Sequence, residues 1–134
     1  MTIRYVQEPD LDAQAFRDLL AATTLGARRP IDDLPRLERM LRQADIVLTA
    51  RAGTQLVGIA RAITDFAYAC YLSDLAVHAS FQRQGIGRRL IAETHAVAGT
   101  CSTLVLVAAP GAETFYAGIG MAKLPSSWAI WRSS

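Results

Sequence analysis

The residues best suited to chemistry in this sequence are two glycines that precede an amphipathic stretch. Gly85 and Gly87 stand where a loop gives way to apolar residues at helical spacing, Ile86, Leu90 and Thr94. The first N–H groups of a helix have no intrahelical partner, and the helix dipole adds partial positive charge there. Glycines let an anion lie against this backbone, and nearby arginines add full charge: Arg83, Arg88 and Arg89. The pattern predicts a site for a phosphate or pyrophosphate.

Two familiar phosphate motifs do not fit this segment. A P-loop ends in Gly-Lys-Ser/Thr, whereas Gly87 is followed by Arg88 and Arg89. A dinucleotide fingerprint has a third glycine and a tight turn after the strand, but position 90 is Leu and residues 78–85 intervene. Neither a P-loop nor a Rossmann site is therefore predicted.

The glycine segment resembles the signature of the GNAT superfamily of acyl-coenzyme A dependent N-acetyltransferases. Residues 82–87, Gln-Arg-Gln-Gly-Ile-Gly, match the family pattern Gln/Arg-x-x-Gly-x-Gly/Ala. The resemblance implies direct transfer of an acetyl group from acetyl-CoA, as co-substrate, to a primary amine of a small molecule, peptide or protein. It implies contacts with the coenzyme from the preceding strand and the glycine loop, at Leu75, Ala76, Val77, Gln82, Arg83, Gln84, Gly85, Ile86, Gly87 and Arg88. A helix start that binds no ligand is the structural alternative.

A second motif lies near the end of the sequence. Phe115, Tyr116, Gly120 and Met121 are spaced like the GNAT pattern Phe-Tyr-x-x-x-Gly-Phe, with Met121 in place of the last aromatic. The family's tyrosine often protonates the coenzyme A thiolate, so the resemblance implies this catalytic role for Tyr116. A phenol with a pKa of about 10 is protonated at neutral pH and can donate. The alternative is a tyrosine that only packs and hydrogen-bonds.

One family feature is missing just before this motif. Many GNAT proteins have an asparagine there that contacts the coenzyme, whereas residues 108–112 are Ala-Ala-Pro-Gly-Ala. That contact is not expected in this protein.

The reaction also needs a base, because only the neutral form of an amine attacks a thioester. The catalytic candidate is Asp74, because a carboxylate inside an apolar strand is rare unless it is paired or functional. The alternative is a hydrogen bond between Asp74 and the backbone or a nearby arginine such as Arg61. His78 and His95 are expected at the surface, since neither has an obvious partner to orient it.

The sequence defines the acceptor site less well. GNAT acceptor sites are usually built from the first two helices and their connector, which here contains Arg28 and Arg29. These arginines either contact an acidic acceptor or are solvated. Asp65 and Tyr68, before the central strand, either line the acceptor pocket or belong to a loop.

Length and composition set the outer limits. The chain has 134 residues, 51% of them hydrophobic and 19% charged, which favours one globular domain spanning residues 1–134. The net charge of +2 gives no support for nucleic-acid binding. Cys70 and Cys101 lack metal or redox spacing, so we expect free thiols and no metal. No signal peptide or membrane span is evident, and a cytoplasmic location is expected.

Hydrophobic periodicity predicts the elements that position these motifs. We expect strands near residues 3–6, 46–51, 56–63, 71–77, 104–107 and 127–132, and helices near residues 10–26, 31–43, 86–97 and 112–118. The fold class is α/β (α+β), with a GNAT-like mixed, mainly antiparallel sheet, a splayed parallel pair, and helices on both faces. Trp128 and Trp131 in the last strand are expected in the core, with a homodimer surface as the alternative.

Two other functions compete with catalysis. A regulatory or scaffolding module would keep the acyl-CoA site without turnover. A helix-turn-helix nucleic-acid binder on the first two helices is disfavoured, because Asp32, Asp33 and Glu38 balance the basic residues there.

Overall fold

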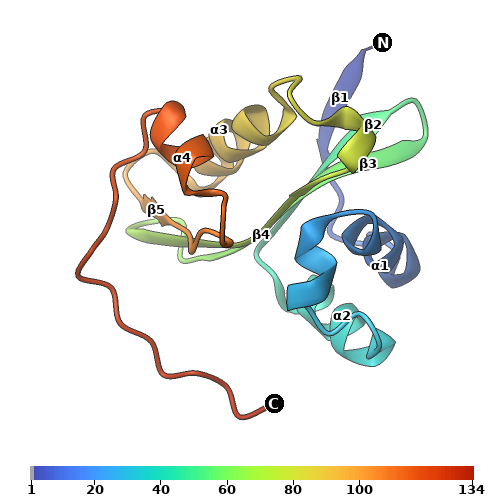
Figure 1. The fold of residues 1–134 in the computed structure, drawn as a ribbon, viewed down its shortest axis with the longest axis horizontal. Helices are drawn as coiled ribbons and strands as arrows, with labels where there is room; N and C mark the ends of the chain where they lie inside the picture. Colours follow the sequence, from blue (N-terminus) through green and yellow to red (C-terminus); the bar gives the residue numbers. More distant parts are fainter. Residues whose placement is uncertain (1) are drawn as a thin grey trace.

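A single mixed sheet forms the centre of the protein, and its five strands follow one another in chain order (Figure 1). The computed structural model describes residues 2–134. The strands are β1 (Ile3–Gln7), β2 (Ile46–Ala52), β3 (Gln55–Thr64), β4 (Ala69–Val77) and β5 (Thr103–Val105). The pairs from β1 to β4 are antiparallel, and β4 and β5 are parallel. The predicted fold class is therefore confirmed.

Two helices cover one face of this sheet. They are α1 (Ala13–Ala21) and α2 (Leu34–Gln43), joined through the 3-10 turn η1 (Thr24–Arg28). Aspartates cap both starts, because the carboxylate of Asp12 accepts the N–H of Ala15 and that of Asp33 accepts the N–H of Arg36. Apolar residues of both helices pack against the sheet in one buried cluster. The helices contribute Phe16, Leu20, Leu37 and Leu41, and the strands β2, β3 and β4 contribute Val47, Ile59 and Ala76.

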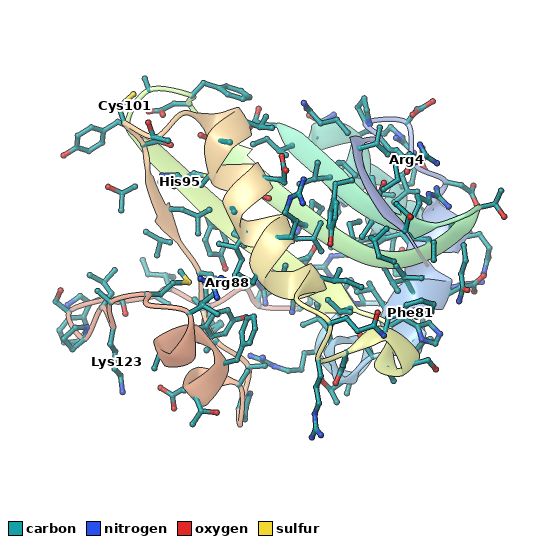
Figure 2. The ribbon with its side chains drawn as sticks, turned by 90° about the horizontal axis from the view of Figure 1, so that it is seen from above. Arg4, Phe81, Arg88, His95, Cys101 and Lys123 are labelled. Atoms are coloured by element: carbon teal, nitrogen blue, oxygen red, sulfur yellow. The ribbon has the colours of Figure 1, made fainter. Side chains whose placement is uncertain are left out.

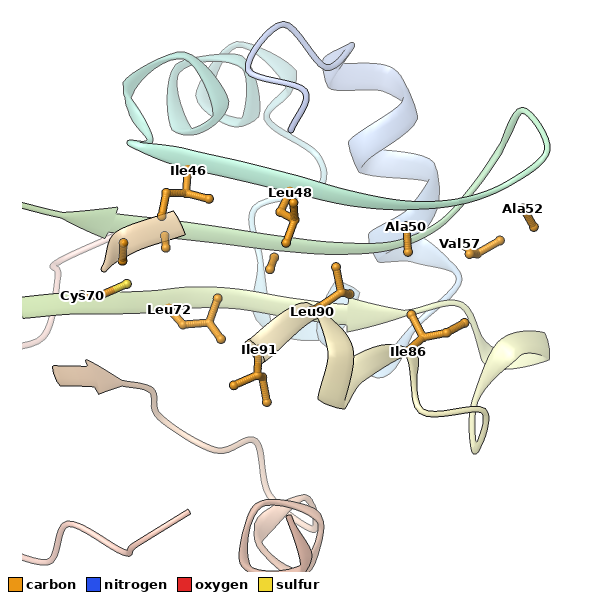
Figure 3. Packing of buried hydrophobic residues seen from close by; sticks show 13 residues of the cluster. Ile46, Leu48, Ala50, Ala52, Val57, Cys70, Leu72, Ile86, Leu90 and Ile91 are labelled. Atoms are coloured by element: carbon orange, nitrogen blue, oxygen red, sulfur yellow. The ribbon is translucent and has the colours of Figure 1, made fainter. Parts of the chain in front are cut away.

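The longest helix, α3 (Ile86–Ala98), lies across the opposite face, and α4 (Glu113–Gly118) lies on the same side (Figures 1 and 2). Buried residues of α3 pack against inward side chains of the strands (Figure 3): Ile46, Leu48, Val57, Leu72, Ile86, Leu90 and Ile91. The approach is close at Gly58, where a Cβ would meet Leu90 Cδ1 at 3.1 Å. This glycine lets α3 seat directly on β3.

Strand β4 changes face at Ser73. Arg61 pairs with Asp74 while Ala62 pairs with Leu72, so Ser73 is an extra residue in β4, a β-bulge. Before the bulge, Leu72 packs in the cluster under α3. After it, Ala76 packs in the cluster under α1 and α2. Because side chains alternate along a strand, Asp74 shares the face of Ala76.

Three sequence predictions were wrong in detail. The first helix ends at Ala21 rather than near residue 26, because Thr23 caps the separate turn η1. The last paired strand covers only Thr103–Val105 and is half-buried, since the chain leaves β4 there. Residues 127–132 form no strand, and Trp128 and Trp131 are 95% and 72% exposed. Within residues 2–134, no strand lies beside this segment, so its backbone has no strand partner for hydrogen bonds.

The segment after α4 instead crosses to the side of α2 (Figure 1). There Arg36 Nη2 donates to the backbone oxygen of Ser134 at 3.0 Å.

Within residues 2–134, no helix combines the length and the apolar character needed to cross a membrane.

Candidate active site

The site forms where β4 and β5 separate. These strands pair at only three positions, from Ala69 with Thr103 to Tyr71 with Val105. Beyond Tyr71, β4 keeps β3 on one side but has no strand on the other within residues 2–134. The backbone of Leu75, Ala76 and Val77 lies along this free edge. An extended ligand can therefore pair with β4 where β5 does not.

The start of α3 lies just after this edge and has the features of an anion site. Gly85 precedes the helix with φ +80°, and no side chain caps it. Its first backbone bond runs from the N–H of Arg89 to the oxygen of Gly85, so the N–H groups of Ile86, Gly87 and Arg88 precede the helical ladder. A Cβ on Gly85 would meet nothing within 4 Å. This open space at a helix N-terminus fits a phosphate group.

The loop between β4 and α3 is fixed by local contacts. Gln82 Nε2 donates to the backbone oxygen of Val77 at 3.3 Å, which ties the loop to the end of β4. His78 accepts the N–H of Ser80 at its Nδ1 and stacks edge-on against Phe81, so it caps the turn η2 (Ala79–Phe81). Arg83 has φ +64°, an uncommon backbone conformation for a residue with a side chain. The loop has a defined shape, and His78 has a structural place in it.

Gly87 leaves the backbone open at the anion site and also allows two helices to pack closely. A Cβ there would lie 3.3 Å from Cζ of Phe115 on α4. The glycine therefore lets α4 approach the start of α3, which brings the two sequence motifs together. The rings of Phe115 and Tyr116 then meet edge to face, with centroids 5.0 Å apart.

The three arginines of the glycine segment differ in their partners. Arg89 is paired with Glu93 at 2.7 Å and lies over the ring of Tyr5, with 4.7 Å between the guanidinium carbon and the ring centroid. Arg83 and Arg88 are exposed and form no ion pair in the part of the chain that the structure covers. These two side chains are therefore the ones available to a phosphate.

Tyr116 is half-buried on α4 and lines a cavity of about 620 Å³. Burial raises the pKa of its phenol above the usual 10.0, because the phenolate loses hydration. The side chain therefore remains a proton donor over the whole neutral range. This environment suits the donor role that was predicted for Tyr116.

Asp74 is fully buried beneath this cavity and is held by two arginines. Its Oδ1 accepts Nε of Arg29 at 2.5 Å, and its Oδ2 accepts Nε of Arg61. The Ser73 bulge produces this arrangement, since it turns Asp74 toward the face covered by α1 and α2, where the connector between them carries Arg29. Paired carboxylate oxygens without solvent contact are poorly placed to take a proton from an amine. These contacts favour the structural alternative for Asp74 over the role of base.

The cavity lies between the η1 connector, the free edge of β4, α4 and the final segment. Arginines dominate its polar lining: Arg28, Arg29, Arg36, Arg61 and Arg132. Asp65 and Tyr68 do not line it, and Asp65 instead accepts three backbone N–H groups within its own loop. Their predicted alternative as loop residues is the one that the structure favours. His95 binds the backbone oxygen of Ser102 at 2.9 Å and is also structural.

Two lining residues were missed by sequence reasoning. Arg36 lies on α2 and was assigned to no site from the sequence. Arg132 follows the apolar run that resembled a strand. Their approach to the cavity depends on the path of the final segment, for which the sequence has no local signal. In residues 2–134, no group of three or more His, Cys, Asp or Glu side chains could hold a metal ion.

Known proteins share this combination of sequence and fold. Residues 29–127 match the family model described as "Acetyltransferase (GNAT) domain". An uncharacterized N-acetyltransferase, ycf52, of Pyropia yezoensis is 29% identical over 98 residues, which is 69% of this chain. The chain spans only 56% of that relative's length.

Solved structures show the same fold at low sequence identity. A GNAT family acetyltransferase from Streptococcus pneumoniae TIGR4 superposes with a TM-score of 0.81 at 23% identity, covering 98% of both chains. The aminoglycoside N-acetyltransferase AAC(6')-Iy, solved in complex with CoA, superposes with a TM-score of 0.75 at 19% identity, covering 99% of this chain and 96% of that one. With the family model matching most of the sequence, the chain belongs to the GNAT family of acetyltransferases.

Proposed function

We propose that this protein transfers an acetyl group from acetyl-CoA to a primary amine. The observation that carries the proposal is the free edge of β4, with the anion site of α3 at one end and Tyr116 in a cavity beside it. The pyrophosphate is bound by residues 82–88, and the pantetheine arm pairs with the backbone of residues 75–77. These are the contacts that the sequence motif implied.

The chain's own groups divide the chemistry between them. Acetyl-CoA supplies an activated acyl group whose thiol is the leaving group. Backbone N–H groups of residues 75–77 donate to the thioester oxygen as negative charge develops on it. The amine nitrogen bonds to the acyl carbon, the carbon–sulfur bond breaks, and the hydroxyl of Tyr116 gives its proton to the departing sulfur. The proton lost by the nitrogen leaves through water and restores the phenol.

Asp74 has a positioning role in this proposal. Its carboxylate holds Arg29 and Arg61 beneath the cavity and does not reach the reacting atoms. The amine is then deprotonated by solvent, which requires no buried base.

The acetyl-CoA site is tested with a matched pair of glycine variants. Gly85→Asp places a negative charge where the pyrophosphate binds. Gly53→Asp is the control, because Gly53 also has positive φ and open space around its Cβ but lies in the hairpin turn between β2 and β3. Aspartate tolerates this left-handed conformation. We expect calorimetric affinity for acetyl-CoA to fall at least tenfold in Gly85→Asp and to be unchanged in Gly53→Asp.

Two results would contradict the proposal. Absence of acetyl-CoA binding by the folded parent would remove its basis. Binding without turnover on any amine would instead support the acyl-CoA-binding module with a regulatory or scaffolding role.

We further propose the setting in which the protein works. Residues 1–134 act as one domain, and the exposed apolar side chains of Trp128, Ile130 and Trp131 bury against a second copy in a homodimer. Cys70 and Cys101 are both free, which suits the reducing cytoplasm. The acceptor amine belongs to a small molecule or a peptide.

A further inference from the structure

The cavity beside Tyr116 has an unusual charge for a site that receives an amine. Five arginines line it and no aspartate or glutamate does. Within residues 2–134, Asp74 is the only side-chain carboxylate within ion-pair distance of any of them. Five guanidinium groups against one carboxylate leave four positive side-chain charges in excess. A cavity lined with this excess of positive charge attracts anions and repels polycations.

Two of these arginines are held in fixed positions. Arg29 donates to Asp74, to the backbone oxygen of Arg28 at 2.8 Å and to that of Ser73 at 2.7 Å. Arg61 is 7% exposed and donates to Asp74, to Ser73 Oγ and to the backbone oxygen of Met40. A guanidinium has five N–H groups, so each keeps donors for a ligand. The side-chain entropy of these arginines is already lost before the ligand arrives.

Arg36 binds an oxygen of the chain itself at the cavity wall. Its Nη2 donates to the backbone oxygen of Ser134 at 3.0 Å, and both residues line the cavity. Arg28 and Arg132 are exposed at its rim and donate no side-chain hydrogen bond within residues 2–134. An oxygen anion entering the cavity would therefore find unused donors around it.

The phosphates of acetyl-CoA do not account for these charges. The proposed pyrophosphate site involves residues 82–88 at the start of α3, and none of them lines the cavity. The cavity instead adjoins the connector before α2, the Ser73 bulge and Tyr116. Its arginines are therefore left for the acceptor.

We infer that the acceptor is a small amine that also carries an anionic group, a carboxylate or a phosphate. This inference rests on the proposed acetyltransferase function and names its substrate class. The guanidinium groups bind the anion through paired N–H donors, which leaves the amine at the other end of the molecule directed toward the acyl group. A volume of about 620 Å³ is in the range of small-ligand sites. A polycationic aminoglycoside is a poor acceptor, although a protein of similar fold acts on that class.

The test compares three small acceptors that share an aminoethyl group and differ in the group at its other end, together with one polycationic acceptor. β-Alanine, its amide, O-phosphoethanolamine and the aminoglycoside sisomicin are each supplied with acetyl-CoA, and thiol release is followed. We expect kcat/KM for β-alanine or for O-phosphoethanolamine to exceed that for the amide at least tenfold, and the larger value identifies the anion. The inference would be overturned if kcat/KM were equal for β-alanine, its amide and O-phosphoethanolamine. A higher kcat/KM for sisomicin would also overturn it. Either result would leave the acetyltransferase function intact.

A pair of arginine variants locates the effect in the cavity. Arg36→Gln removes a lining charge, whereas Arg39→Gln removes a charge from the same helix outside the cavity. We expect the ratio of anionic to neutral acceptor rates to fall at least fivefold in Arg36→Gln and to stay unchanged in Arg39→Gln. Calorimetric binding of N-acetyl-β-alanine and of its amide gives a second readout that needs no turnover. Binding without preference for the carboxylate, or equal effects of the two variants, would place the anion site elsewhere.

Discussion

At the scale of single residues, the two catalytic candidates, Asp74 and Tyr116, differ in their partners. Asp74 is paired with two arginines and has no exposed surface. Burial, with no contribution from a charged group, raises the pKa of the Tyr116 phenol above its usual value. In the proposed mechanism, proton donation depends on this one phenol at the wall of the cavity.

The Tyr116→Phe variant tests that dependence. We expect kcat to fall about 10²-fold, because general acid catalysis typically contributes that much, with binding of acetyl-CoA unchanged. A raised pKa means that the parent keeps its proton donor until the pH rises past the ordinary phenol value. The parent should therefore lose activity only at strongly alkaline pH, and the variant should lack this decline. Stopped-flow thiol release across pH measures both effects, and an unchanged kcat would assign Tyr116 to packing.

The site could be predicted from sequence where its residues are neighbours in the chain. Gly85 and Gly87 adjoin a helical pattern, and Tyr116 follows a recognisable spacing, so local signals were sufficient. The pair between Arg61 and Asp74 was predicted as an alternative because both lie in adjacent strands. Arg28 and Arg29 were named as possible acceptor contacts because they lie on the connector between the first two helices. Arg36 and Arg132 were not, because their place in the cavity depends on the path of the final segment, on which periodicity has no information.

At the scale of elements, the β-bulge in β4 decides which face Asp74 occupies. In a regular strand Leu72 and Asp74, two residues apart, would share a face, and the carboxylate would point under α3. A charge there would lie among aliphatic side chains. The bulge instead directs it to the connector that supplies Arg29. No alternation rule applied to the sequence could have predicted this change of face.

The Asp74→Ala variant separates its two assigned roles. Removing the carboxylate leaves two guanidinium groups facing each other in a largely buried place, and we expect the free energy of unfolding to fall by roughly 3 kcal/mol. Urea denaturation measures this, with Asp32→Ala as the exposed control that should be neutral. If stability is retained and kcat falls instead, Asp74 is the base.

At the scale of the whole molecule, the final segment is the largest difference between the predicted and observed structure. The alternation in residues 127–132 fits a strand, and its tryptophans fit a core. Both predictions assume a neighbour within the same chain. The sheet of residues 2–134 ends at β5, so the apolar side chains of this segment remain in solvent.

A second copy would supply the missing neighbour, and solution association tests this. We expect the parent to sediment as a dimer and the double variant Trp128→Ser, Ile130→Ser to sediment as a monomer. The matched control is Leu124→Ser, which removes an exposed apolar residue before the aromatic run. A monomeric parent across micromolar concentrations would contradict the homodimer.

The short pairing of β5 with β4 also affects how readily the protein aggregates. A strand with one bare side presents unpaired peptide groups that invite other chains, which is the usual start of edge-to-edge aggregation. In the proposed function, acetyl-CoA pairs with residues 75–77, acts as a temporary extra strand and closes that exposure. Its supply would then control the lifetime of the folded enzyme as well as its rate, since any ligand that binds only the native state stabilises it by mass action.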